Sequence, residues 1–215
     1  MPPIFITGIG TDVGKTLVAA VVTQALGADY WKPVQAGFAD GTDAEWVRSM
    51  VADPHTVIHD EVYRLHTPAS PHIAARKDGI TIDGALITEQ ARAIQARTAS
   101  RPLVIEGAGG LLVPLNDTWF VADLIKAIGA RVVLVSRNYL GSINHSLLTA
   151  AYCREKGLDV AGWIFNDDYL SYEHEIVSWS GYPSLGSLPK LEKIDQEAIQ
   201  EQASRISDSL QAAFT

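Results

Sequence analysis

Short apolar segments alternate with longer segments of helical periodicity along this chain of 215 residues. Apolar segments in which polar residues do not alternate are typical of strands that are buried on both faces of a sheet. Such segments predict strands at 4–7, 30–34, 102–106, 131–136, 160–166 and 185–188. Periodic segments predict helices at 15–26, 43–51, 82–98, 120–128, 143–156 and 194–213. Residues 53–69, with two prolines and three histidines, predict irregular structure, and a turn at 70–71 precedes a further helical start.

The alternation of strands and helices predicts the fold class. Helices between buried strands cover both faces of a sheet, and right-handed crossovers make consecutive strands parallel. We therefore expect an α/β protein with an open, mostly parallel sheet and helices on both faces. No repeat or Pro/Ser-rich linker divides the chain, so residues 1–215 are expected to form a single domain. Ligands of such sheets bind beyond the carboxyl ends of the strands, so the loops that follow strands are the candidates for function.

The charge balance narrows the classes of ligand. Lys and Arg total 17 and Asp and Glu total 25, which gives a formal net charge of −8. An acidic surface repels phosphate backbones, so we expect no nucleic-acid partner, and a phosphate ligand must be held by local positive groups. The single cysteine, Cys153, excludes an intrachain disulfide. The first residues show no basic segment followed by an apolar one, so we expect no signal peptide. No apolar run reaches the roughly 20 residues that span a bilayer, so we expect a cytoplasmic protein without a membrane partner.

The strongest motif lies at residues 7–16, Thr-Gly-Ile-Gly-Thr-Asp-Val-Gly-Lys-Thr, between a predicted strand and a predicted helix. Glycines let a loop curl so that backbone N–H groups converge on a phosphate, and the helix N-terminus adds partial positive charge. Lys15 can reach the outer phosphates, and the Thr16 hydroxyl can bind Mg²⁺. Five residues separate Gly8 from Gly14, where the strict motif has four. The alternative is a glycine-rich turn with a surface lysine, but the coincidence of strand, loop and helix favours a phosphate loop and a P-loop NTPase-like fold.

Polar residues at other predicted strand ends are further candidates. Glu106 is followed by Gly-Ala-Gly-Gly; its carboxylate could hold Mg²⁺ directly or through water, and the glycines could offer N–H groups to an anion. Lys32, beside the stiff Pro33, could pair with a substrate anion. Asp43 predicts a helix N-cap that could also bind a metal. Asn166 has the paired donor and acceptor that suit a base edge. For each, the alternative is a turn, a cap or a solvated side chain.

These motifs, in this order and spacing, resemble those of the dethiobiotin synthetase family. The matching segments are Thr-Gly-x5-Gly-Lys-Thr at 7–16, Lys-Pro-Val at 32–34, Thr-Asp-Ala at 42–44, Ser-Pro-His at 70–72, Glu-Gly-Ala-Gly-Gly at 106–110, Leu-Gly-Ser-Ile-Asn-His at 140–145 and Gly-Trp-Ile-Phe-Asn at 162–166. The lengthened phosphate loop is the form that this family uses. The resemblance implies an ATP-dependent ligase of biotin biosynthesis, working as a homodimer, that forms C–N bonds. It would close the ureido ring on 7,8-diaminononanoate (7,8-diaminopelargonic acid) with CO2 and MgATP.

The resemblance also implies a role for each matching residue. Lys15 and Lys32 would be catalytic, because they would neutralise the γ-phosphate and a carbamate formed from an amine and CO2. The metal ligands would be Thr16, Asp43 and Glu106. The nucleotide would contact Gly10, Thr11, Asp12, Val13, Gly14, Lys15, Thr16, Glu106, Asn166, which would read adenine, and Pro189. The diamine would contact Thr11, Asp12, Lys32, Gly109 and Gly110, and, across the dimer interface, Leu140, Gly141, Ile143 and Asn144. Two residues depart from the family pattern: Ala36, where Ser or Thr is common, and Asp12, where glutamate is common.

Other interpretations share the predicted fold. A nucleotide-dependent switch or partitioning ATPase would use a related loop, but such proteins have a second lysine at the position of Gly10, and the chain offers no basic amphipathic membrane helix. An amidotransferase-type synthetase would need a glutaminase domain, for which the chain has no room. A paralogous synthetase that acts on another diamine stays open, because Ala36 lacks a hydroxyl.

Overall fold

The structure, a computed structural model, describes residues 1–97 and 101–214, so residue 98 of the predicted helix 82–98 lies outside the described residues. A seven-stranded sheet has the order β4-β2-β6-β1-β7-β8-β9, with parallel neighbours throughout, and β3 and β5 form a separate parallel pair. The strands are β1 Ile4–Gly8, β2 Asp29–Trp31, β3 Val34–Ala36, β4 Ile58–His59, β5 Tyr63–Leu65, β6 Leu103–Gly110, β7 Arg131–Arg137, β8 Val160–Asn166 and β9 Ser184–Leu188. The helices are α1 Lys15–Leu26, α2 Asp43–Met50, α3 Pro71–Lys77, α4 Gly84–Arg97, α5 Val121–Ile128, α6 Ser142–Lys156, α7 Glu173–Ser180 and α8 Gln196–Phe214, with a 3-10 turn at Tyr169–Ser171. The predicted α/β fold with a parallel sheet is confirmed.

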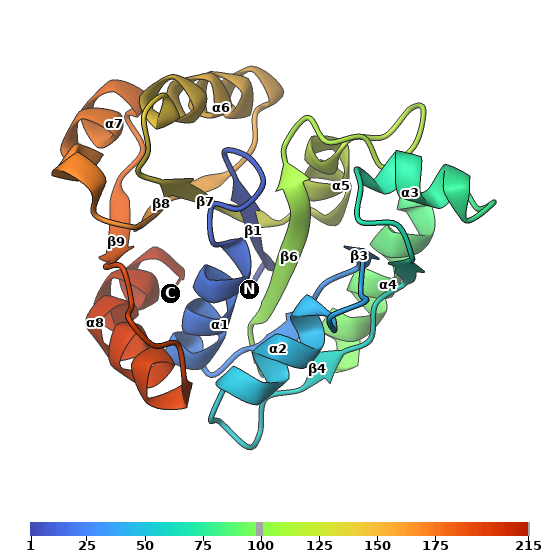
Figure 1. The fold of residues 1–215 in the computed structure, drawn as a ribbon, viewed down its shortest axis with the longest axis horizontal. Coiled ribbons are helices and arrows are strands. Elements are labelled where there is room, and N and C mark those ends of the chain that lie inside the picture. Colours follow the sequence, from blue (N-terminus) through green and yellow to red (C-terminus); the bar gives the residue numbers. More distant parts are fainter. Residues whose placement is uncertain (98–100, 215) are drawn as a thin grey trace.

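Helices cover both faces of the seven-stranded sheet (Figure 1). α1, α2 and α8 lie on one face, and α3 to α7 lie on the other. Successive residues of β1 belong to different cores: Ile4 and Ile6 pack with side chains of α1 and α8, whereas Phe5 packs with side chains of α4 and α5. All three are fully buried. A strand that is buried on both faces is apolar without alternation, which is the pattern seen in the sequence.

The strand order brings the carboxyl ends of β1 and β6 together. In their parallel register Ile6 lies opposite Glu106, and Gly8 lies opposite Gly110. The loop that follows β1 therefore lies beside the glycines that end β6. On its other side β1 pairs with β7, which places Gly8 opposite Val135. The predicted phosphate loop and the predicted carboxylate thus meet at one edge of the sheet, where ligands of this fold class bind.

The prediction of one strand at 30–34 is wrong, because the chain leaves the central sheet within it. β2 ends at Trp31, and β3 begins at Val34 in the two-stranded sheet. Pro33 lies between them and has no N–H to donate to a ladder. Its carbonyl instead accepts hydrogen bonds from the N–H groups of Val62 (2.9 Å) and Tyr63 (3.0 Å). Lys32 therefore sits where the chain turns away from the end of β2.

The prediction of irregular structure at 53–69 is wrong in part. The short strands β4 and β5 lie in this segment and pair with β2 and β3, respectively. Strands of two and three residues carry little periodic signal, and their pairing is set by their neighbours. The sequence pattern also misses α7, in which only Ile176 and Ser180 are buried. The remaining predicted strands and helices are confirmed apart from their ends, and Gly157 ends α6 in the left-handed conformation, with φ 63°.

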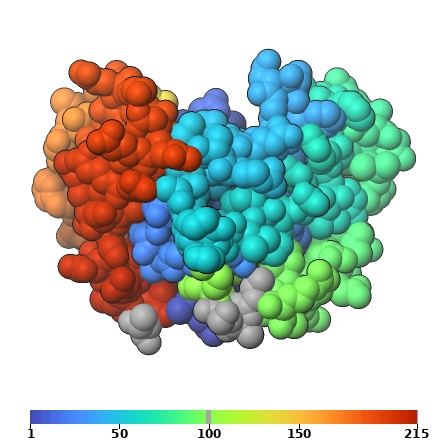
Figure 2. Space-filling view, turned by 90° about the horizontal axis from the view of Figure 1, so that it is seen from below, coloured from blue at the N-terminus to red at the C-terminus, as the bar shows by residue number. Residues whose placement is uncertain are grey.

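Figure 2 shows the face on which the C-terminal helix α8 lies beside α2. The side chain of Gln196 in α8 donates to the carbonyl of Ser49 in α2 at 3.1 Å. α8 also packs along α1 through buried residues such as Ile199 and Leu210. The helix that follows the phosphate loop, α1, is thus covered by α2 and α8. Within the described part of the chain, no helix combines the length and the apolar character needed to cross a membrane.

Candidate active site

The loop between β1 and α1 is held from the side by β8. It ends at Gly14, whose φ of 90° is a left-handed conformation that favours glycine. A side chain at this position would overlap the amide of Asn166, whose Nδ2 donates to the Val13 carbonyl at 3.1 Å. α1 begins directly afterwards, at Lys15, without a side-chain cap. The N–H groups of its first turn are therefore available to an anion, as a phosphate loop requires.

The Lys15 side chain folds back over this loop. Its Nζ donates to the Gly10 carbonyl at 2.8 Å, and the residue is only 8% exposed. Burial lowers the pKa of the Lys15 ammonium, and the nearby Glu106 carboxylate opposes part of that shift. A phosphate oxygen would give this ammonium a stronger, charge-assisted hydrogen bond than the loop carbonyl does. This geometry suits the predicted catalytic role of Lys15, which stays a prediction.

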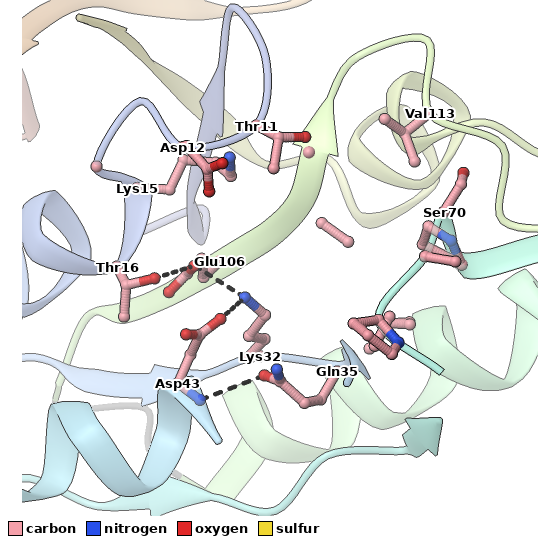
Figure 3. Close-up of a pocket in the computed structure, with 18 residues that line it drawn as sticks. Thr11, Asp12, Lys15, Thr16, Lys32, Gln35, Asp43, Ser70, Glu106 and Val113 are labelled. Atoms are coloured by element: carbon pink, nitrogen blue, oxygen red, sulfur yellow. Dashed lines mark hydrogen bonds and ion pairs between the residues drawn. The ribbon is translucent and has the colours of Figure 1, made fainter. Parts of the chain in front are cut away.

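Thr16, Lys32, Asp43 and Glu106 form a carboxylate–lysine cluster beneath the loop (Figure 3). Lys32 Nζ donates to Glu106 Oε1 at 2.9 Å and also to Asp43 Oδ2, and Thr16 Oγ1 donates to the same Glu106 oxygen at 2.9 Å. The side chains of Lys32 and Glu106 are 8% and 1% exposed. Burial by itself would lower the pKa of Lys32, but the carboxylates of Glu106 and Asp43 outweigh it and raise that pKa. The cluster thus holds one positive charge between two negative ones.

Asp43 contributes to the cluster because it is the first residue of α2 and not its N-cap. The N-cap is Thr42, whose hydroxyl accepts from the Glu45 N–H at 3.1 Å, while Glu45 Oε2 accepts from the Thr42 N–H at 2.8 Å. The prediction that Asp43 caps this helix is therefore wrong, since the preceding threonine completes a capping box. The Asp43 carboxylate is left for Lys32, and its N–H donates to Gln35 Oε1 at 3.3 Å.

Tyr30, which no sequence motif singles out, reaches the cluster from β2. Its hydroxyl donates to Glu106 Oε2 at 2.7 Å, and both residues are buried, with exposed fractions of 0% and 1%. Burial, together with the charge and the hydrogen bond of Glu106, raises the pKa of Tyr30 well above its ordinary value. The hydroxyl is therefore a stable donor. The sequence did contain one signal for this role, a tyrosine inside an apolar segment. A buried phenol needs a hydrogen-bond partner, so such a tyrosine indicates a polar group nearby.

The loop and the cluster open into one cavity of about 830 Å³. Charged side chains line the part of it beside the loop and the cluster. Its apolar lining residues, which we call the apolar wall, are Val34, Ala36, Pro68, Ala69, Pro71, Ala108 and Val113. Figure 3 shows Val113 and Ser70 across the cavity from Thr16 and Asp43. Gln35 and Ser70 add polar groups to the lining, and Ser70 Oγ lies 3.1 Å from His72 Nδ1. The cavity suits a ligand that has polar groups at one end and an alkyl chain at the other.

This cavity gathers half of the residues that the sequence predicts for the site, and Figure 3 shows several of them facing one another. They are Thr11, Asp12, Gly14, Lys15, Thr16, Lys32, Asp43, Glu106 and Gly109. Val13 is buried beneath the loop, and Asn166 contacts the loop from β8. Six others do not line it: Gly110, Leu140, Gly141, Ile143, Asn144 and Pro189. Gly10 also lies outside its lining, although its carbonyl binds Lys15.

A second cavity, of about 370 Å³, lies between the loop and α6, and Gly10 and Gly110 line it. The turn before α6 is held in place by Tyr172, whose hydroxyl lies 2.6 Å from Ser142 Oγ and donates to the Tyr139 carbonyl at 2.8 Å. Three leucines expose much of their surface around this cavity and turn: Leu112 (59%), Leu140 (91%) and Leu148 (61%). Of the predicted residues in this segment, Leu140, Gly141 and Asn144 are exposed, whereas Ile143 packs against the core, and none of the four lines the first cavity of its own chain.

The donor atoms of the cluster fit a hard divalent cation. Among residues 1–97 and 101–214, no three or more His, Cys, Asp and Glu side chains group in a way that could hold a metal ion. Mg²⁺ does not require such a group, because it commonly takes one or two carboxylates and completes its shell with water and substrate phosphates. Asp43 and Glu106 already share the Lys32 ammonium, so the space between them accepts a positive charge. The cluster therefore fits Mg²⁺ that arrives with a nucleotide.

Comparison with solved structures shows the fold. The chain is similar to the MinC:MinD cell division protein complex of Aquifex aeolicus, with a TM-score of 0.60 and 12% identity over 99% of this chain and 95% of that chain. It is also similar to the ParA family ATPase of Chlorobium tepidum TLS, with a TM-score of 0.56 and 14% identity over 99% and 93%. At such identities the likeness concerns the fold alone, and it confirms the predicted P-loop NTPase-like architecture.

Comparison of sequences identifies the family. Residues 3–198 match a family model described as an AAA domain. The ATP-dependent dethiobiotin synthetase BioD of Cytophaga hutchinsonii is 46% identical over 97% of this chain and 98% of that protein. Proteins of the same name from Christiangramia forsetii and Rhodopseudomonas palustris (strain HaA2) are 42% and 43% identical, over 96% and 92% of this chain and 96% and 90% of their own lengths. Because this identity extends over nearly the whole chain, the chain belongs to the family of ATP-dependent dethiobiotin synthetases.

Proposed function

We propose that the chain catalyses the ATP-dependent, ring-closing carboxylation of 7,8-diaminononanoate with CO2 to dethiobiotin, a step of biotin biosynthesis. The observation that carries this proposal is the cavity of about 830 Å³ in which a phosphate loop, the carboxylate–lysine cluster and an apolar wall meet. The names of the relatives supply the reaction. The triphosphate would lie against the phosphate loop, the carbamate beside the carboxylate–lysine cluster, and the alkyl chain of the diamine along the apolar wall.

The triphosphate of ATP would bind the loop that precedes α1. Backbone N–H groups at the start of α1 would donate to its oxygens, and the Lys15 ammonium would exchange the Gly10 carbonyl for the γ-phosphate. Asn166, at the end of β8, and Pro189, just after β9, would contact the nucleotide base. Asn166 already touches the loop through the Val13 carbonyl, so the base and phosphate positions adjoin.

Thr16, Asp43 and Glu106 would hold Mg²⁺. When bound, this ion would neutralise charge on the phosphates during phosphoryl transfer. Lys32 lies between the same two carboxylates, so the ammonium and a metal ion cannot share that position. We expect Lys32 to leave the carboxylates when the metal enters and to pair with the carbamate instead. The positive charge that pairs with these carboxylates would then stabilise the substrate.

The chemistry needs three steps in this cavity. One amine of the diamine adds to CO2 and loses a proton, which gives a carbamate. A carbamate oxygen then attacks the γ-phosphorus of ATP and ADP leaves, which gives a mixed carbamic–phosphoric anhydride. The second amine attacks the carbonyl of the anhydride, loses a proton and displaces inorganic phosphate as the ring closes. Two anions must meet in the second step, and Lys15 and Lys32 would reduce their repulsion there.

The diamine would lie with its amines near the loop and its chain along the apolar wall. The Asp12 carboxylate and the Thr11 hydroxyl line the same cavity and would bind an ammonium. The N–H groups of Gly109 and Gly110 would donate to the distal carboxylate. Ala36 leaves the wall without a hydroxyl at its position, so selectivity among diamines of different length is part of the test.

We also propose that a homodimer completes the site. Residues 140–144 do not line the first cavity, yet Tyr172 holds their turn in one conformation and Leu140 projects from it. A second copy would cover the exposed side chains of Leu112, Leu140 and Leu148, which lie around the second cavity. Backbone N–H groups of residues 140–143 from that copy would then reach the distal carboxylate of the diamine.

The direct test mixes purified protein with MgATP, bicarbonate and 7,8-diaminononanoate. Product mass and phosphate release are followed with and without the diamine, and diamines of other chain lengths serve as controls. We expect dethiobiotin, with one phosphate released for each molecule formed, and little release when the diamine is omitted. Hydrolysis that ignores the diamine would point to a switch ATPase. Turnover of a different diamine alone would point to a paralogous synthetase.

A further inference from the structure

We propose that Tyr30 is a positioning residue that fixes the Glu106 carboxylate so that only Oε1 faces the catalytic cavity. The inference rests on the proposed function, because it takes Glu106 to be a ligand of Mg²⁺. Tyr30 is not among the residues that line the cavity, and its hydroxyl donates to Glu106 Oε2, the oxygen that neither Thr16 nor Lys32 contacts. It would therefore act on the reaction through Glu106.

The register of β2 with β6 explains how Tyr30 reaches this carboxylate. Tyr30 lies opposite Val104, which is two residues before Glu106 and on the same face of the sheet. The tyrosine ring packs in the same core as Val104, and its hydroxyl lies 2.7 Å from Glu106 Oε2. Tyr30 is fully buried, so water cannot replace it as a donor.

The two oxygens of Glu106 have separate partners. Oε2 accepts from Tyr30, whereas Oε1 accepts from both Thr16 and Lys32. The last torsion of a glutamate side chain is broad, so nothing intrinsic to the residue selects this orientation. Without the hydroxyl, Oε2 would be a buried acceptor with no partner, and the carboxylate would rotate or withdraw from the metal position. The hydrogen bond thus assigns Oε1 to the cation and leaves Glu106 a one-oxygen ligand.

The variant Tyr30→Phe removes the hydroxyl and keeps the ring. Its matched control is Tyr63→Phe, since the Tyr63 hydroxyl accepts from the Asp83 N–H at 2.9 Å outside the cluster. Binding of Mn²⁺ to the protein–ADP complex is measured by the electron paramagnetic resonance signal of free Mn²⁺. We expect Tyr30→Phe to weaken Mn²⁺ binding about 10- to 100-fold, the usual effect of losing an outer-shell partner of a metal ligand. ADP binding without metal should not change, and Tyr63→Phe should bind Mn²⁺ as the wild type does.

A double-variant cycle separates positioning from general loss of structure. If Tyr30 acts through Glu106, Tyr30→Phe should have no further effect on Mn²⁺ binding when Glu106→Gln is already present. Equal additional weakening in that background would overturn the inference, as would unchanged Mn²⁺ binding in Tyr30→Phe alone. If Tyr30→Phe does not fold, infrared difference spectra of the wild type on adding Mn²⁺ and ADP decide instead. Bands that are absent in Glu106→Gln should show one-oxygen coordination, and two-oxygen coordination would contradict the inference.

These outcomes remain distinct from failure of the proposed function. Wild-type protein that makes dethiobiotin while Tyr30→Phe binds Mn²⁺ normally would reject the role of Tyr30 alone. Wild-type protein that makes no dethiobiotin would reject the proposed function. Unchanged Mn²⁺ binding in Glu106→Gln would reject Glu106 as a metal ligand, and with it the basis of the inference.

Discussion

Replacing Lys32 by methionine should destabilise the protein and make its stability depend on magnesium. The side chain is 8% exposed, and its ammonium lies 2.9 Å from Glu106 Oε1. With an effective dielectric constant of about 20, Coulomb attraction at this distance is about 6 kcal/mol. Desolvation offsets part of that attraction, and removing one partner of a buried ion pair typically costs about 3–5 kcal/mol. We therefore expect the free energy of unfolding to fall by about 3–5 kcal/mol at neutral pH without divalent cations.

Magnesium should restore part of this loss, because Asp43 and Glu106 would then face each other without a cation. The assay is urea unfolding followed by tryptophan fluorescence, with and without Mg²⁺ at constant ionic strength. Lys193→Met is the matched control, since Lys193 pairs with Asp195 on the surface and is 82% exposed; it should change neither the stability nor its response to Mg²⁺. Wild-type stability in Lys32→Met, or an equal response to Mg²⁺ in the variant and the wild type, would refute this role of Lys32.

Three further outcomes are expected. Lys15→Ala should cost about 3–4 kcal/mol of transition-state stabilisation in kcat/KM, because one preorganised cation beside the γ-phosphate is lost. Steady-state kinetics of the folded variant test this prediction, and wild-type turnover would contradict it. Glu106→Gln should raise the Mg²⁺ concentration needed for half-maximal activity, and superimposable titrations of the variant and the wild type would speak against a metal ligand. Burial lowers the pKa of His59, against the opposing pull of the Asp29 carboxylate, so the unfolded chain binds the proton more readily. The His59 contribution to stability is present above about pH 6.5 and is lost as the pH falls through the lowered folded pKa. The free energy of unfolding, measured between about pH 7.5 and 5, should therefore fall less with decreasing pH for His59→Gln than for the wild type.

The parts of the fold that local sequence determines were predictable. The strands at the centre of the sheet are buried on both faces, so their apolar runs stand out without any knowledge of their neighbours. The phosphate loop is also local, because its glycines, Lys15 and Thr16 follow one another along the chain. The extra residue in this loop, compared with the strict motif, is also found in the family that the chain resembles. Glu106 was a candidate because it ends a recognisable strand, Lys32 because it stands beside the stiff Pro33, and Asp43 because it begins a recognisable helix.

The features that sequence patterns missed depend on contacts between distant segments. Pro33 ends β2 early, and the edge strands β4 and β5 exist only through pairing with β2 and β3. The hydrogen bond from Tyr30 to Glu106 joins residues 76 positions apart. Asp43 and Thr42 both suit an N-cap, and only the helix geometry decides between them. Sequence could propose the members of the site but not their partners.

The position of β6 between β1 and β2 has a consequence for biogenesis. Thr16 and Glu106 are 90 positions apart in the sequence, yet they form a hydrogen bond within the carboxylate–lysine cluster. During synthesis the glycine-rich loop can form early. The Glu106 carboxylate reaches its place beneath the loop only after β6, a much later strand, has paired between β1 and β2. Metal-dependent nucleotide binding should thus require a fully assembled sheet, and a truncated or partly folded chain should not hydrolyse ATP in the cell.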